Sequence, residues 1–181
     1  MSLERVTNII KYREQAFGAA ALIAAIIAAR YEPTSALVVF RERQDDLLHD
    51  LLHDFAFKSR KLIELATAEA IPAKNWASQG MIIGFRSRKT DSLIEKCEHY
   101  SLWFILGRVI HSDSLEIMRT PVQINPDTPE ITHQLPWAFT VSSDFDKDEQ
   151  KEHFVFIDEL LKCFITLDKQ LQDYLETIRH C

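Results

Sequence analysis

Two side chains that could act on a phosphate ester, Arg108 and His111, stand three residues apart. They follow an apolar stretch, Leu102 to Leu106, which predicts a helix that stops or bends at Gly107. A guanidinium pairs bidentately with a phosphate, and a histidine that titrates near neutral pH can donate or accept a proton. The pair could therefore support metal-independent cleavage of RNA by the neighbouring 2′-hydroxyl. The competing interpretation is structural, because a cation at a helix end satisfies carbonyls and the helix dipole.

A second set of chemically capable residues comprises Asp46, His49, Asp50 and His53. Their spacings of three, one and three place them on one side of a helix, where carboxylates and imidazoles could hold a metal. A di-metal bundle would need matching ligands on facing helices, and these are incomplete. The alternative is plain amphipathicity, with a leucine stripe buried and these residues facing water. We expect no cofactor, since neither a GxxxxGK loop nor a GxGxxG occurs.

The composition indicates one mainly α domain. The 181 residues, 46% of them hydrophobic, can bury a sizeable core, and only 4 Gly and 6 Pro imply few turns and long elements. The net charge of -6 argues against broad nonspecific binding of duplexes, although basic groups at Lys58, Arg60 and Lys61 could form a local patch. Three widely spaced cysteines suggest neither a disulfide framework nor a zinc site, and we expect a cytoplasmic protein.

The elements that must position these residues form, by expectation, an up-and-down helical bundle with a small β-hairpin insertion. The apolar periodicity and the helix-stop signals predict a single helical domain, 1–181, with helices at 2–31, 35–70, 92–106 and 147–179. Residues 73–89 read as a loop with a short strand near Met81. Four prolines exclude a continuous helix in 115–143, which reads as a hairpin-like segment with strands near 116–124 and 137–142.

Two apolar stretches bear on partners. The run Ala16 to Ala29 is too short for a membrane-crossing helix, so membrane association is not expected and a buried first helix is. Near the C-terminus, apolar residues repeat at spacings of four and three from Leu160 to Ile178, a stripe that packs internally or forms a homodimer. Trp103 is expected in the core, whereas Trp76 and Trp137 could line a groove or interface.

The segment GRVIHSDSLEI, with the helix before it and the all-helical length, resembles the HEPN (higher eukaryotes and prokaryotes nucleotide-binding) superfamily. Members of that superfamily are helical bundles that commonly dimerise and often cleave RNA with an arginine and a histidine near a helix end. The usual gap between those two residues is four to six, whereas only Val109 and Ile110 separate Arg108 from His111. The resemblance implies a homodimeric protein that binds or cleaves RNA or nucleotides. The alternatives are a noncatalytic protein-interaction or dimerisation module and a metal-dependent helical-bundle enzyme.

Overall fold

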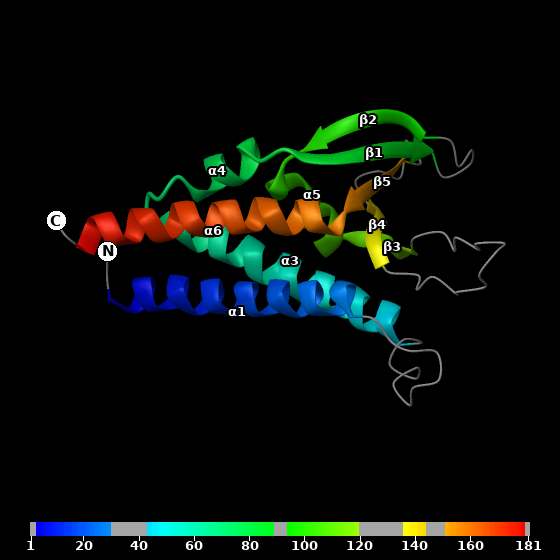
Figure 1. Cartoon of the computed structure of the whole chain (residues 1–181). Helices are drawn as coiled ribbons and strands as arrows, with labels where there is room; N and C mark the ends of the chain where they lie inside the picture. Colours follow the sequence, from blue (N-terminus) through cyan, green and yellow to red (C-terminus); the bar gives the residue numbers. More distant parts are fainter. Residues whose placement is uncertain (1–2, 30–42, 89–93, 120–135, 144–150, 180–181) are drawn as a thin grey trace.

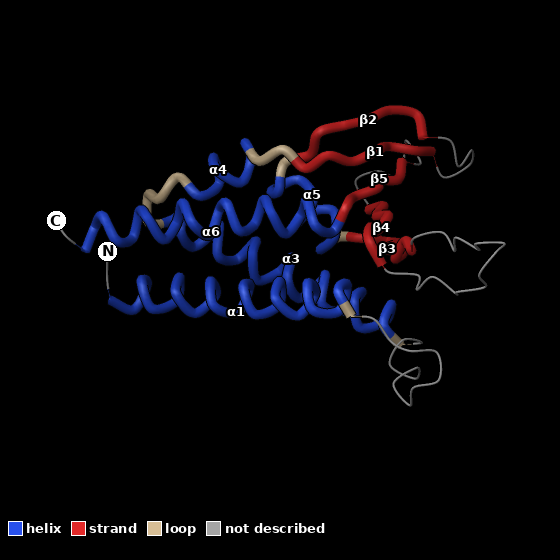
Figure 2. Tube along the Cα trace, viewed as in Figure 1, coloured by secondary structure: helices blue, strands red, loops and turns tan. Residues whose placement is uncertain are grey.

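The computed structural model describes residues 3–29, 43–88, 94–119, 136–143 and 151–179. These residues form five helices and five strands: α1 (Leu3–Ala28), α3 (Gln44–Ala68), α4 (Ala73–Gln79), β1 (Ile82–Arg88), β2 (Ile94–Tyr100), α5 (Leu102–Ile110), β3 (Ser112–Arg119), β4 (Pro136–Ser143), β5 (Lys151–Phe156) and α6 (Ile157–Arg179). The long helices α1, α3 and α6 lie along the molecule, both chain ends lie at one end, and the strands gather at the other (Figures 1 and 2).

The strands form one antiparallel sheet in the order β2-β1-β5-β4-β3. Two hairpin-like pairs, β1 with β2 and β3 with β4, are joined by β5, which pairs with β1 on one side and β4 on the other. One sheet face carries Phe139, Val141 and Val155, which are fully buried. That face belongs to the same hydrophobic core as the helices.

The expectation of a mainly α bundle with a small hairpin insertion is therefore wrong, and so is the all-helical architecture implied by the resemblance. A five-stranded sheet is part of the core, and the protein is mixed α and β. The expected hairpin is present, since β3 pairs with β4 antiparallel, but these strands make one side of a larger sheet. The strand expected near Met81 is β1, and the helix α4 occupies part of the expected loop.

Two expected helices begin later than predicted because strands occupy their first residues. In 92–106 the segment Ile94–Tyr100 is β2, and in 147–179 the segment Lys151–Phe156 is β5. Both strands alternate: Tyr100 is buried beside exposed His99, and His153 and Val155 are buried between half-buried neighbours. Both segments contain Glu and Lys, which favour helices locally. Pairing with β1 in the sheet overrides that preference, and the segments form strands. Ser101 then caps α5 by accepting from the Phe104 N–H at 3.1 Å.

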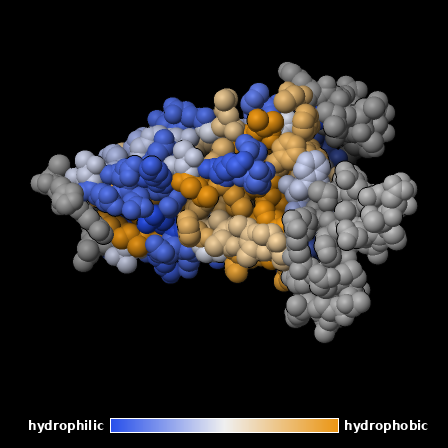
Figure 3. All heavy atoms as spheres, viewed as in Figure 1, coloured by the Kyte–Doolittle hydropathy of each residue, from blue (hydrophilic) through white to orange (hydrophobic). Residues whose placement is uncertain are grey.

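The first helix is not buried all round. One stripe of α1 (Ile9, Ala16, Ala19, Ala20 and Ile23) enters the core, while Phe17 and Leu22 are 47% and 56% exposed. The hydrophobic residues of Figure 3 gather midway along the visible face, where the second half of α1 and the start of α6 reach the surface. Among the described helices, none combines the length and the apolar character that crossing a bilayer requires.

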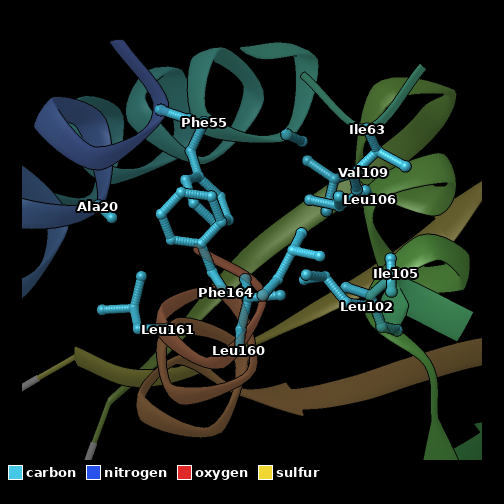
Figure 4. Packing of buried hydrophobic residues seen from close by; sticks show 14 of the residues in the cluster. Ala20, Phe55, Ile63, Leu102, Ile105, Leu106, Val109, Leu160, Leu161 and Phe164 are labelled. Atoms are coloured by element: carbon cyan, nitrogen blue, oxygen red, sulfur yellow. The ribbon is translucent and has the colours of Figure 1, made fainter. Parts of the chain in front are cut away.

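The C-terminal apolar stripe packs internally for most of its length. Phe164 and Leu171 are fully buried, and the Phe164 ring meets the Phe55 ring of α3 edge to face at 5.1 Å between centroids. Figure 4 shows these two rings beside the buried residues of α5, including Leu102, Ile105 and Leu106. Between Phe164 and Leu171 on the same helix, Asp168 has a buried carboxylate that accepts two hydrogen bonds, of 2.6 and 2.9 Å, from Arg13 of α1.

Candidate functional site

Arg108 is part of an aromatic stack between α5 and the sheet. Its guanidinium carbon lies 4.4 Å from the centroid of the Phe104 ring, so the side chain is directed back along α5. The Phe104 ring stacks on Tyr100 at 5.5 Å, and the buried His153 meets both rings edge-on while its Nδ1 lies 3.1 Å from the Tyr100 hydroxyl. Arg108 therefore contributes to the packing of α5 through a cation–π contact.

His111 occupies a different environment. It is the C-cap residue of α5, and its backbone N–H reaches the carbonyls of Gly107 and Val109. Its side chain is exposed, whereas Arg108 is half-buried. The His111 side chain thus lies at the surface, whereas the Arg108 side chain packs on Phe104. A joint catalytic role for Arg108 and His111 stays a prediction.

The residues expected as metal ligands on α3 are only partly brought together. The rings of His49 and His53 lie 4.7 Å apart, and His49 Nδ1 is 3.6 Å from Asp50 Oδ1, while Asp46 is exposed. Within the described ranges, no three His, Cys, Asp or Glu side chains are placed to hold a metal ion. The geometry therefore offers no support for a metal-dependent enzyme on this helix face.

A cation–aromatic cluster lies where α3 meets α4 and α5. The Arg60 guanidinium carbon of α3 lies 3.3 Å from the centroid of the Trp103 ring, and Lys74 Nζ of α4 lies 4.9 Å from the same centroid. Arg60 also approaches the Trp103 carbonyl and the Glu64 carboxylate, each at 3.4 Å. The contact with Glu64 is long, joins residues one turn apart and faces solvent, so it holds the guanidinium only weakly.

Two turns earlier on α3, His53 meets the start of β3. Its Nε2 lies 3.3 Å from the Ser112 hydroxyl, with the proton position set by the tautomer of the ring. Burial and, second, the neighbouring His49 lower the pKa of His53 below its ordinary value of 6.5, while Asp50 acts in the opposite direction. His53 is therefore neutral at pH 7 and can accept a proton.

These contacts define one surface, which we call the α3–α5 seam: Arg60, Trp103 and Lys74 at one end, and His49, His53 and Ser112 at the other. Arg60 and His53 are seven residues apart, so they share a helix face about 10 Å apart along the axis. α5 runs antiparallel to α3 here, since Trp103 meets Arg60 and Ser112, just beyond its end, meets His53. The seam combines two cations, an indole ring and a neutral imidazole.

Sequence reasoning missed the Arg60–Trp103 contact, which joins residues far apart in the chain. The basic cluster around Arg60 was visible, but Trp103 lies in an apolar helix and reads as a core residue. The structure leaves Trp103 half-buried, with Arg60 over its face. The one available signal was the shared helix face of Arg60, His53 and His49, at spacings of seven and four.

Comparisons with known proteins found no relative of this chain. No family model matches it, and neither the curated proteins nor the solved structures gave a match.

Proposed function

We propose that this protein binds single-stranded RNA or a related nucleotide chain along the α3–α5 seam. The observation that carries this proposal is the placement of Arg60 and Lys74 around Trp103. Single-stranded nucleic acids are held by cations that meet phosphates and by aromatic rings and Arg planes that meet bases. Arg60 supplies both a charge and a planar surface, and its solvent-facing contact with Glu64 can be exchanged for a phosphate.

The His53 end of the seam suits the sugar–phosphate backbone. A neutral imidazole 3.3 Å from the Ser112 hydroxyl offers one donor and one acceptor within a short distance, which matches a ribose 2′-hydroxyl. The overall charge of -6 opposes nucleic acid binding elsewhere on the molecule, so we expect a single local site that weakens strongly with salt.

The test is the affinity of a fluorescein-labelled 12-nucleotide oligouridine, followed by anisotropy at 50 to 200 mM salt. Arg60→Gln is expected to weaken binding about tenfold, equivalent to about 1.4 kcal/mol, and to flatten the salt dependence by about 0.7 in the log–log slope. Trp103→Leu keeps an apolar side chain but removes the ring, and it should weaken binding without changing that slope.

Lys169→Gln is the matched control, because Lys169 is an exposed lysine on α6, outside the seam. It should bind like the wild type. Equal affinity of the Arg60→Gln, Trp103→Leu and Lys169→Gln proteins would overturn the proposal, as would the absence of binding by the wild type at 50 mM salt.

Cleavage of the bound strand is a separate prediction that belongs to His111. Because its side chain is exposed, His111→Ala should leave the fold intact and abolish any RNA cleavage that the wild type shows. Gel analysis of the labelled oligouridine measures this directly. Cleavage by the variant at the wild-type rate would remove His111 from the mechanism.

Protein interaction is a second candidate, and the sheet face that points away from the core favours it. Trp137 is an extra residue in β4: Ala138 pairs with Met118 and Pro136 with Arg119, so Trp137 forms a β-bulge. Its ring packs against Phe154 and Phe156 and remains 38% exposed. Partly exposed aromatic clusters are typical of protein interfaces. Trp137→Ser should leave oligouridine affinity unchanged, because Trp137 lies in β4, outside the α3–α5 seam.

A further inference from the structure

A cavity of about 230 Å³ is lined by residues of α4 and α6 and by those just before β1. Its walls include the Trp76 indole and the residues that follow α4, with the Cys163, Thr166 and Gln170 side chains opposite them on α6. Trp76 is fixed there by an edge-to-face contact with Tyr174, with 6.0 Å between centroids. Gly80 lies close to the Cys163 side chain, since a Cβ at this position would be in van der Waals contact with Cys163 Sγ, at 3.6 Å.

The lining is uncharged, although charged residues make up 27% of the chain. Leu102 and Leu167 supply apolar surface, and Gln79 and Gln170 supply amides that each donate and accept hydrogen bonds. The Thr166 hydroxyl donates to the Lys162 carbonyl at 3.0 Å, so its oxygen is left as an acceptor for a ligand. The Cys163 thiol is half-buried, and burial together with Glu159 raises its pKa, which keeps the thiol neutral.

We infer that this cavity binds a small uncharged molecule, about one ring in size, that carries an amide or hydroxyl group. An engineered apolar cavity of about 150 Å³ is large enough for benzene, so the observed volume accommodates a ring and one polar substituent. A charged group held inside the cavity would lose hydration to a lining that offers no counter-charge, and the lining therefore favours uncharged ligands. The site is separate from the α3–α5 seam and does not depend on the function proposed for it.

The rate at which the Cys163 thiol is alkylated reports whether the cavity is occupied. The probe is 2-chloro-N-phenylacetamide, an uncharged aromatic amide whose CH₂–Cl carbon is attacked by the thiolate; the C–S bond forms, chloride leaves, and the thiol proton passes to buffer. Because the pKa of Cys163 is raised, little thiolate is present and reaction from solution is slow. Prior binding in the cavity should make the Cys163 rate saturate with probe concentration.

Mass spectrometry resolves Cys163 from Cys97, which is exposed on β2 and serves as the control cysteine. We expect saturation at Cys163 and a linear rate at Cys97, and we expect acetanilide, which lacks the chlorine, to slow only Cys163, by at least fivefold. Iodoacetate, which is charged, should react with Cys97 faster than with Cys163. Linear kinetics at both cysteines, or no protection by acetanilide, would overturn the inference.

A pair of α6 variants checks that the cavity itself is responsible. Thr166→Phe places a ring in the cavity from an exposed position and should remove saturation at Cys163. Lys169→Phe adds the same ring one turn away, outside the lining, and should retain saturation. Circular dichroism confirms that both variants are folded, and saturation that survives Thr166→Phe contradicts the site.

Discussion

We expect the titration of His53 to contribute to the pH dependence of this protein's stability. Burial and His49 lower the pKa of His53 in the folded protein, so the unfolded chain takes up this proton more readily than the folded one. The contribution of neutral His53 is therefore fully present above about pH 6.5 and is lost as the pH falls through its lowered folded pKa. We expect the wild type to lose stability relative to His53→Gln between pH 7.5 and pH 5.

Urea unfolding at several pH values measures this difference in the free energy of unfolding. His99→Gln, an exposed position on β2, is the control and should track the wild type across the same range. A gap between wild type and His53→Gln that does not change with pH would contradict the lowered pKa.

At the residue scale, the sequence identified side chains of useful chemistry but not their neighbours. His49 and His53 do lie together, as their spacing on one helix predicts. The partner of His53 is Ser112, which is 59 residues away in the chain, and Arg60 contacts Trp103, which is 43 residues away. Such contacts depend on how α5 crosses α3, and no local pattern specifies that crossing.

At the scale of single elements, we expect replacement of glycine by alanine to have opposite effects on stability at two positions. A Cβ at Gly84 in β1 would clash with the backbone carbonyl oxygen of Phe154 in β5 and approach the Tyr100 ring of β2 to 2.7 Å, so Gly84→Ala should cost about 1–3 kcal/mol through overpacking. Gly18 in α1 has nothing within 4 Å of an added Cβ, so Gly18→Ala should stabilise the protein by about 0.5–1 kcal/mol. Thermal unfolding of the two variants measures both effects, and equal changes in Tm would contradict this packing.

Element types were predictable where a pattern was long and periodic. The helices α1 and α3 and most of α6 follow apolar repeats, and Trp137 lies near the start of a strand, as expected. β2 and β5 were missed because their sequences, with Glu and Lys among apolar residues, fit a helix as well as a strand. These segments form strands because they pair with β1, which is near β2 in the sequence and far from β5.

For the whole molecule, the buried part of the α6 stripe belongs to the core, so those side chains are not on the surface where a second copy would bind. Leu171→Ala should therefore cost about 2–5 kcal/mol of stability, while Ile165→Ala, at a position 54% exposed on the same helix, should change it little. Chemical unfolding gives these values. A smaller assembly from Leu171→Ala with unchanged stability would contradict the buried position.

Homodimerisation stays a prediction, and any interface must use surface outside the buried part of that stripe. Light scattering of the wild type tests it, with an expected mass of twice the 21.0 kDa of one chain. A mass of one chain would remove the homodimer and, with it, one property that the resemblance implied.

The central position of β5 also determines when the sheet can be completed during synthesis. The pairs β1–β2 and β3–β4 are available early, but the strand between them is the last of the five in the chain and leads directly into α6. Until residue 156 leaves the ribosome, β1 and β4 each present an open edge to other chains. We expect slow completion of the sheet and aggregation of nascent chains that stall before β5.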